Sequence, residues 1–257
     1  MRDLRAQNVA AEMADLLPIL PPIQVEAEVD STNLRLKQAA RAGRVAPPYL
    51  LIADCQTAGR GRLGRAFLSP PGTGLYMSLL CDPGRDTDPG RITLLAAVAV
   101  CRAIEDLTPL RPRIKWVNDL FVRGRKVCGI LAEKIDEGVI IGIGVNVRTP
   151  PGGFPPEAGA AGALEAEIDR SRLAGRMGGY LLRLLQDPND PQILEDYRSR
   201  MPLIGREIQF QRDGQTKNAR VTGVADDGGL MIRTDDGPDI LRCGEVSLGS
   251  QAFSGLE

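Results

Sequence analysis

The sequence predicts an α+β fold followed by a small all-β unit, and three observations lead to this class. Over residues 1–202, candidate strands and helices follow one another without strict alternation, which is typical of α+β folds. After residue 202, short apolar runs are separated by Asp-Gly turns, which is typical of small β-barrels. The 257 residues are 43% apolar and 25% charged, a globular composition that supports one or two domains. We expect domains at residues 1–202 and 203–257.

Caps, apolar periodicity and turn residues predict each element in order. A helix is predicted over residues 32–42, because Ser31 is a good N-cap residue and Gly43 is typical of a helix C-terminus. Residues 92–107 are apolar nearly all round and predict a buried helix that is broken by Pro109. In chain order the expected elements are a short helical pattern before residue 18, the helix 32–42, strands 49–53 and 74–80, the helix 92–107, strand residues 113–117 and 121–122, a hairpin of strands 127–135 and 139–147, helices 168–185 and 193–200, and strands 208–210, 219–224, 229–233 and 239–242.

Charge and composition exclude several classes of protein. The 32 basic and 33 acidic residues leave a net charge of -1, so no global field attracts nucleic acid or a membrane, and any phosphate site must be local. Histidine is absent, which excludes Ser-His-Asp and Cys-His catalysis and His-ligated zinc. The five cysteines are widely spaced without a C-x-x-C pair and predict buried, reduced thiols rather than a disulfide framework or a metal site. The longest apolar run has eight residues and the N-terminus does not resemble a signal peptide, so we expect a cytoplasmic protein.

A glycine- and arginine-rich segment lies between the first two expected strands. Residues 59–65 read Gly-Arg-Gly-Arg-Leu-Gly-Arg, which matches the G-x-G-x-x-G pattern of dinucleotide-binding loops. A Rossmann loop opens directly into a helix, whereas residues 65–71 are a poor helix start. Arginine side chains suit phosphate or carboxylate, so we interpret the segment as an anion-wrapping loop. An exposed hairpin tip is the alternative.

Residues 115–120 read Lys-Trp-Val-Asn-Asp-Leu and place a cation, an aromatic ring, an amide and a carboxylate close together. In a continuous strand, Lys115 and Asp119 would point to one face and Trp116 and Asn118 to the other. All of them can therefore face one ligand only if the strand ends within the motif. The alternative is a core tryptophan beside a solvated turn.

Glycines interrupt both strands of the expected hairpin 127–147. Gly129 follows Lys126 in the first strand, and Gly142 and Gly144 alternate with apolar residues in the second. Glycine inside a strand costs stability and often marks backbone that a ligand approaches closely. Asn146 ends the second strand in apolar surroundings, and its amide needs a partner, either backbone or the edge of a base.

Taken together, these motifs resemble those of the biotin protein ligase family. The resemblance covers most of the chain and rests on residues 30–33, 56–65, 115–120, 125–133, 142–146 and 244–247. It implies a catalytic domain like that of class II aminoacyl-tRNA synthetases, with a mixed sheet and helices, followed by a small SH3-like β-barrel. It also implies a short form, because the 28 residues before the first motif cannot form the N-terminal DNA-binding domain of longer members.

The resemblance implies an ATP-dependent ligase. Biotin and MgATP would give biotinyl-5′-AMP and pyrophosphate, and a lysine of a biotin carboxyl carrier domain of a biotin-dependent carboxylase would then take the biotinyl group. ATP with Mg²⁺ is the co-substrate and biotin the substrate, with no tightly bound prosthetic group and no nucleic-acid or membrane partner. The catalytic residues implied are Lys126, Arg60, Arg62 and Asp119. The substrate-binding residues implied are Ser31, Thr32, Asn33, Gln56, Gly59, Gly61, Lys115, Gly129 and Leu131. The nucleotide-binding residues implied are Phe67, Asn118 and Asn146.

The chain departs from the family pattern at two motif positions. Phe67 stands where the family usually has a tryptophan, and Val117 where it usually has a proline. Two other functions are weighed against the ligase. A lipoate or octanoyl transferase on the same scaffold typically carries a histidine in its glycine motif, and this chain has no histidine. A non-catalytic biotin-binding module would be expected to lack the cations Arg60, Arg62 and Lys126, which are present.

Overall fold

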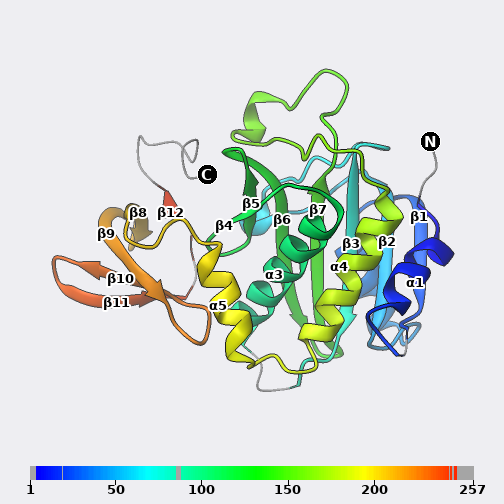
Figure 1. The fold of residues 1–257 in the computed structure, drawn as a ribbon, viewed down its shortest axis with the longest axis horizontal. Helices are drawn as coiled ribbons and strands as arrows, with labels where there is room; N and C mark the ends of the chain where they lie inside the picture. The colour runs from blue at the N-terminus through cyan, green and yellow to red at the C-terminus, as the bar shows by residue number, and fades with distance from the viewer. Residues whose placement is uncertain (1–3, 19, 85–87, 243, 245, 248–257) are drawn as a thin grey trace.

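The larger part of the chain is built on one seven-stranded mixed sheet (Figure 1). The computed structural model describes residues 4–18, 20–84, 88–242, 244 and 246–247. The strand order is β1-β2-β3-β7-β6-β5-β4, in which β1 and β2 are parallel and the other neighbours are antiparallel. The strands are β1 (Ile23–Val29), β2 (Tyr49–Gln56), β3 (Gly74–Cys81), β4 (Arg113–Lys115), β5 (Asp119–Val122), β6 (Arg125–Ile135) and β7 (Gly138–Asn146).

Helices cover the two faces of this sheet unequally. In Figure 1, α3 (Pro89–Leu107) and α4 (Arg170–Leu184) lie side by side across one face, and α1 (Ala6–Ala14) packs against α4 at its edge. The opposite face is covered by α2 (Thr32–Arg41), which contacts β2, β3 and β7. The remaining helix, α5 (Pro191–Ser199), packs on α3 beside the C-terminal unit.

Alternation along the strands decides which residues reach each face. In β7, Ile141, Ile143 and Val145 belong to the core under the helices α3 and α4. Ile140 belongs instead to the small apolar cluster under α2, so the even-numbered residues of β7 point to the α2 face. Gly142 and Gly144 therefore lie on the α2 face, and this placement opens room for a site there.

The C-terminal unit is a five-stranded antiparallel sheet in the order β11-β10-β9-β8-β12. Its strands are β8 (Glu207–Arg212), β9 (Gln215–Val224), β10 (Leu230–Thr234), β11 (Gly237–Leu241) and β12 (Val246–Ser247). The turn between β9 and β10 docks on the larger part, where Trp116 Nε1 donates to Gly228 O at 3.0 Å and buried Arg91 donates to Asp226 O at 3.2 Å. One apolar core runs through both parts. The domain boundary at residue 203 lies between α5 and β8 and stays a prediction.

The expected elements are confirmed with three differences, one of which is that the short strand β12 was not anticipated. The strand β1 was not anticipated, because residues 23–29 follow two prolines and alternate apolar with polar residues over a single short stretch. Its formation depends on parallel pairing with β2, a partner more than 20 residues away in sequence. The expected strand 113–117 ends at Lys115, and the chain reverses before β5 begins at Asp119. Within the described residues, no helix combines the length and apolarity needed to cross a membrane.

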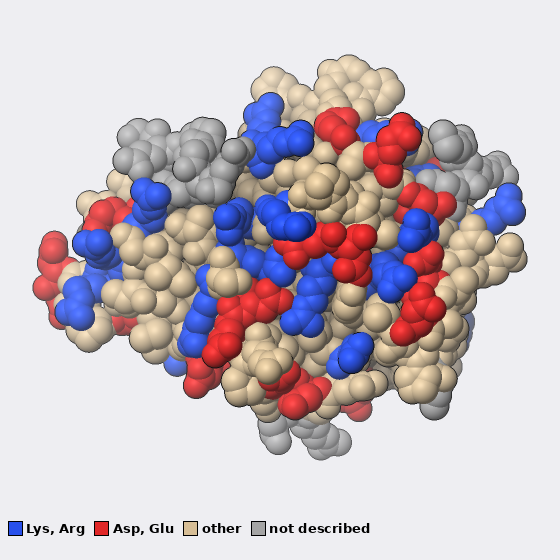
Figure 2. Space-filling model, viewed as in Figure 1, with Lys and Arg blue, Asp and Glu red and all other residues tan. Residues whose placement is uncertain are grey.

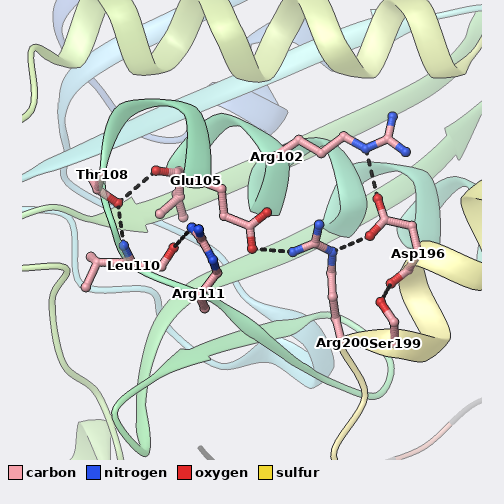
Figure 3. Close-up of polar contacts among 9 residues, drawn as sticks. Arg102, Glu105, Thr108, Leu110, Arg111, Asp196, Ser199 and Arg200 are labelled. Carbon is pink, nitrogen blue, oxygen red and sulfur yellow. Dashed lines mark hydrogen bonds and ion pairs between the residues drawn. The ribbon is translucent and has the colours of Figure 1, made fainter.

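Ion pairs join helices on the face seen in Figure 2, where basic and acidic side chains are interspersed. In the network of Figure 3, Arg200 Nη1 contacts Glu105 Oε1 at 2.5 Å and Arg200 Nε contacts Asp196 Oδ1 at 2.6 Å. Arg102 Nε contacts the other oxygen of Asp196 at 2.9 Å. Burial opposes the charge of Arg200, but the hydrogen bonds that its guanidinium donates to Glu105 and Asp196 outweigh this effect and raise its pKa. The network ties the residue after α5 to α3.

Four of the five cysteines lie in the described part of the chain, and all four are free thiols. Cys243 lies outside the described residues. Cys81, Cys101 and Cys128 are buried, and burial raises the pKa of each thiol, that of Cys81 to about 12. The expected buried, reduced thiols are confirmed at these three positions, whereas Cys55 is half-buried.

The raised pKa of Cys81 predicts a loss of stability at alkaline pH. The unfolded thiol ionises near pH 9.0, whereas burial raises the pKa of the folded thiol to about 12. Its contribution to stability is therefore complete below pH 9 and is lost between pH 9 and 12, at about 1.4 kcal/mol per pH unit. Urea unfolding at pH 8, 9 and 10 should show a shallower decline for Cys81→Ala than for the wild type. Equal slopes would contradict the prediction.

Candidate active site

A cleft of about 710 Å³ opens on the α2 face of the large sheet. Its floor includes Gly129, Gly142 and Gly144 of β6 and β7. Its walls come from residues 31–33 at the start of α2, the loop 56–68, residues 115–121 around the β4–β5 turn, Lys126 and the loop 155–160. Segments far apart in the sequence thus meet around one cavity.

The structure brings nearly all the predicted site residues to this cleft. Those that line it are Ser31, Thr32, Asn33, Gln56, Arg60, Gly61, Arg62, Phe67, Lys115, Asn118, Asp119, Lys126, Gly129 and Leu131. Gly59 and Asn146 are not among the lining residues. The cleft also includes the loop 155–160, for which the sequence offered no signal beyond its prolines and glycines.

One end of the cleft is a network of amides and hydroxyls built on the first turn of α2. Ser31 caps the helix, its Oγ accepting from Leu34 N at 3.5 Å, and this cap leaves Thr32 and Asn33 at the helix start. Both are 4% exposed. Gln56 Oε1 accepts from Thr32 N at 2.9 Å and Gln56 Nε2 donates to Ser69 Oγ at 2.9 Å. The polar end is therefore held by the protein's own hydrogen bonds.

The arginine-rich segment 59–67 folds back on itself as a compact hairpin. Phe67 N donates to Gly59 O at 2.9 Å, and Gly61 N donates to Arg65 O at 2.7 Å. Leu63 and Gly64 form its tip with φ of 55° and 74°, and the Leu63 side chain is 73% exposed. Residues 65–73 contain no helix, which confirms that this is not a dinucleotide-binding loop.

Three glycines, one in the hairpin and two in the sheet, lie close to Phe67. A Cβ at Gly59 would lie 2.4 Å from Phe67 O, so this glycine is needed to close the hairpin. A Cβ at Gly144 would lie 2.5 Å from the Phe67 ring, and one at Gly129, which pairs with Gly144, would lie 3.2 Å from it. The Phe67 ring thus lies against two strand glycines that also line the cleft, and their contact with a ligand stays a prediction.

Gly142 leaves space for the side chain of Asn33. A Cβ at this position would lie 2.2 Å from Asn33 Oδ1. The glycine therefore allows the Asn33 amide to lie directly on β7. The Phe67 ring itself meets Tyr76 edge-on, with ring centroids 6.4 Å apart.

The motif 115–120 turns within the cleft wall. Because β4 ends at Lys115, residues 116–118 reverse the chain, and Lys115, Asn118 and Asp119 all line the cleft. Trp116 points away, is 3% exposed and bonds to the C-terminal unit. The condition that the strand end within the motif is met. Each interpretation of the motif holds for part of it, since the tryptophan is a core residue and its neighbours form the wall of the cleft.

Three basic side chains of the cleft contact neighbouring segments, namely those of Lys126, Arg62 and Lys115. Lys126 Nζ lies 2.7 Å from Asp119 Oδ1. Arg62 Nη1 donates to Asn118 Oδ1 at 2.9 Å and Nη2 donates to Gly244 O at 3.0 Å, which joins the hairpin to the C-terminal unit. Lys115 Nζ lies 6.0 Å from the centroid of the Phe121 ring.

Asn146 lies at the end of β7, and its amide nitrogen is hydrogen-bonded to the protein backbone. Its Nδ2 donates to Gly162 O at 3.0 Å, and the residue is 9% exposed. Of the two partners expected from sequence, the backbone is the one observed. Asn146 is not among the residues that line the cleft, and the nucleotide-binding role implied for it stays a prediction.

Ser78 and Glu133 belong to the polar network but were not anticipated. Ser78 lies on β3, is fully buried, and its Oγ contacts Asn33 Oδ1 at 2.6 Å. Glu133 Oε2 accepts from Asn33 Nδ2 at 2.8 Å. A serine within the apolar strand 74–80 was the available signal for Ser78, whereas nothing local distinguishes Glu133 from other surface carboxylates.

Known proteins share both parts of this architecture. Residues 25–147 match the Biotin/lipoate A/B protein ligase family, and residues 203–249 match the biotin protein ligase C-terminal domain. The biotin-[acetyl-CoA-carboxylase] ligase of Mycobacterium tuberculosis is 33% identical over 239 residues, which cover 87% of this chain and 88% of that relative. The chain belongs to the biotin protein ligase family. The bifunctional ligase/repressor BirA of Bacillus subtilis is 34% identical over 217 residues, covering 78% of this chain and 66% of BirA.

Solved structures agree with this assignment to the biotin protein ligases. The biotin protein ligase from Aquifex aeolicus in complex with biotin and ATP superposes with a TM-score of 0.75 and 30% sequence identity, covering 89% of this chain and 98% of that one. The predicted fold class, a mixed sheet with helices followed by a small β unit, is thereby confirmed.

Proposed function

We propose that this chain activates biotin as biotinyl-5′-AMP at the expense of ATP and transfers the biotinyl group to a lysine of a biotin carboxyl carrier domain. One observation carries the proposal: a single cleft joins a buried amide and hydroxyl end to a basic end. The first end, with Thr32, Asn33 and Gln56, suits the ureido ring of biotin. The second end, with Arg60, Arg62 and Lys126, suits its carboxylate together with the ATP phosphates.

The first half-reaction needs cations more than a base. A carboxylate oxygen of biotin attacks the α-phosphorus of ATP, a new O–P bond forms, and the bond to the leaving pyrophosphate breaks. Both reactants are anions, so fixed positive charges lower the barrier by stabilising charge in the transition state. Because the carboxylate is already ionised, no proton has to be removed, and the absence of histidine from the chain is no obstacle.

In the second half-reaction, the neutral amine of the carrier lysine attacks the acyl carbon, a C–N bond forms, the bond from the acyl carbon to the AMP oxygen breaks, and the proton lost by the amine passes to water. ATP would enter as its Mg²⁺ complex, which usually combines one or two carboxylates with substrate phosphates. The carboxylates that line the cleft are Asp119 and Glu157, and Asp119 is paired with Lys126. The ATP phosphates would therefore be the main ligands of the ion.

A lipoate or octanoyl transferase remains the nearest alternative, because the family matched by residues 25–147 includes lipoate enzymes. The separate match of residues 203–249 to the biotin protein ligase C-terminal domain favours biotin. The relative from Mycobacterium tuberculosis, 88% of which is covered by the match, is also named a biotin ligase. We place the protein in the cytoplasm, since the free thiols of the described part fit a reducing compartment.

The test is a mass measurement on a purified biotin carboxyl carrier domain incubated with the full chain. We expect its mass to rise by one biotinyl group, with both ATP and biotin required. Lipoate or octanoate in place of biotin should give no comparable shift. An unmodified carrier, or a shift by lipoyl or octanoyl instead, would overturn the proposal.

Arg62→Gly is expected to release biotinyl-AMP into solution and to label bystander lysines. In the structure the Arg62 fork bridges the hairpin to Asn118 and Gly244, so its loss removes a charged clamp worth about 1.5–3 kcal/mol. The measurement is biotin incorporation into an unrelated lysine-rich protein in the presence of biotin and ATP.

The matched control is Arg123→Gly. Arg123 is an exposed arginine at the β5–β6 turn with φ of 50°, so glycine is accommodated there, and it is not among the residues that line the cleft. Bystander labelling should stay at the wild-type level in this variant. If Arg62→Gly leaves the bystander unlabelled while carrier biotinylation is normal, the clamp role is wrong.

A further inference from the structure

Ser78 stands at the centre of the polar end without reaching the cleft. It lies on β3, is 0% exposed, and is not among the residues that line the cavity. Its Oγ contacts Asn33 Oδ1 at 2.6 Å and Thr32 Oγ1 at 2.7 Å. Ser78 therefore touches two of the side chains that do line the cleft, from behind.

The orientation of the Asn33 amide is determined by its neighbours. Asn33 Nδ2 donates to Glu133 Oε2 at 2.8 Å and to Leu131 O at 3.3 Å, and both of these atoms can only accept. The amide oxygen must therefore face Ser78, above Gly142. Because this oxygen cannot donate, the single hydroxyl proton of Ser78 is directed to it.

The Thr32 hydroxyl is constrained in turn. Its oxygen contacts Ser78 Oγ, whose proton is committed to Asn33, and Gln56 Oε1 at 3.1 Å. Gln56 is oriented by Thr32 N, which donates to the same Oε1 at 2.9 Å. The Thr32 proton therefore points to an acceptor within the protein in either case. The side chains of Asn33 and Thr32 can therefore only accept hydrogen bonds from a ligand, because their own protons are used within the protein.

We propose that Ser78 and Glu133 are positioning residues that hold Asn33 and Thr32 as hydrogen-bond acceptors and so make the cleft select ligands with N–H donors, such as a cyclic urea. This inference rests on the proposed function and adds the residues that decide selectivity. A ligand of the same shape without N–H groups would face oxygen lone pairs with no hydrogen to share, which is unfavourable in a buried site.

The experiment compares biotin with its cyclic carbonate analogue, in which ring oxygens replace both ureido N–H groups. Calorimetric titrations use the full chain as wild type, Ser78→Ala, Glu133→Ala and Glu133→Gln. Cys81→Ala is the matched control, because it truncates another buried residue of β3 outside the network. We expect the wild type to bind biotin at least 10-fold more tightly than the carbonate.

In Ser78→Ala, biotin affinity should fall about 10-fold while carbonate affinity changes less than twofold, because the carbonate has no hydrogen bond of this kind to lose. Glu133→Ala should act in the same direction, and Glu133→Gln should restore most of the selectivity because its amide oxygen can still accept from Asn33. Cys81→Ala should leave the ratio unchanged.

The outcomes separate the inference from the proposed function. A wild type that does not bind biotin contradicts the proposed function itself. A wild type that prefers biotin, with the same preference in Ser78→Ala and Glu133→Ala, leaves the function standing and overturns the positioning role. An equal fall for both ligands would also overturn it, because it would show a merely structural role. If Ser78→Ala does not fold, the comparison of Glu133→Ala with Glu133→Gln, at a half-exposed position, tests the positioning role instead.

Discussion

Lys126→Ala should reduce the rate of biotinyl-AMP formation about 100-fold or more, the scale seen when one preorganised contact to a developing charge is removed. The structure adds a second reason. Lys126 Nζ lies 2.7 Å from Asp119 Oδ1, so its loss leaves an uncompensated carboxylate facing the incoming phosphates. Single-turnover formation of the adenylate from radiolabelled ATP measures the effect free of product release.

Two further variants show which reason dominates. Asp119→Asn combined with Lys126→Ala removes the uncompensated carboxylate, so its rate should lie above that of Lys126→Ala if repulsion contributes. Lys115→Ala should be less damaging, because Lys115 lies by the Phe121 ring on the cleft wall. Near-normal adenylate formation by Lys126→Ala with an inactive Lys115→Ala would reverse the assignment of the two lysines.

Arg200→Met should lower the free energy of unfolding by about 3 kcal/mol, because it removes the cation paired with the largely buried Glu105 and leaves Asp196 with Arg102 alone. The side chains of Arg200, Glu105 and Asp196 are 14%, 20% and 18% exposed. At this chain length each kcal/mol corresponds to roughly 2–4 °C in Tm. Urea and thermal unfolding measure the loss, which does not depend on any ligand.

Arg102→Met is the control for this prediction. Arg102 is 33% exposed and contacts only one oxygen of Asp196 among the ion pairs of the network in Figure 3, so its loss should cost under about 1 kcal/mol. Equal losses for the two variants would show that the network acts through general surface charge rather than through the buried Arg200.

Local signals were sufficient for most elements. The helix over 32–42 carries its own cap at Ser31, and the hairpin of β6 and β7 carries a glycine turn between two apolar runs. Such signals depend on neighbouring residues alone, so they can be found without knowing the fold. The strand β1 lacked one, because its stability comes from pairing with β2 across more than 20 residues.

The site residues could be predicted from their types and motifs, but the contacts that each of them makes in the folded protein could not. Gly129 and Gly144 were expected to mark backbone that a ligand approaches. They line the cleft, and they also make room for the Phe67 ring, which comes from a hairpin much earlier in the chain. Asn146 was expected to meet either backbone or a base, and it meets Gly162 O. No pattern within one strand can show which distant side chain lies above it.

The sequence by itself determined the fold class, the order of nearly all the elements and the motifs that place this chain among the biotin protein ligases, because caps, periodicity and motif spacing are local properties. Tertiary structure alone decided how the motifs meet. It turned residues 116–118 so that Lys115 and Asp119 share a wall, paired Lys126 with Asp119, and placed Ser78 and Glu133 around Asn33. These arrangements join β3, α2, β5 and β6, and contacts between distant segments form only when the sheet brings them together.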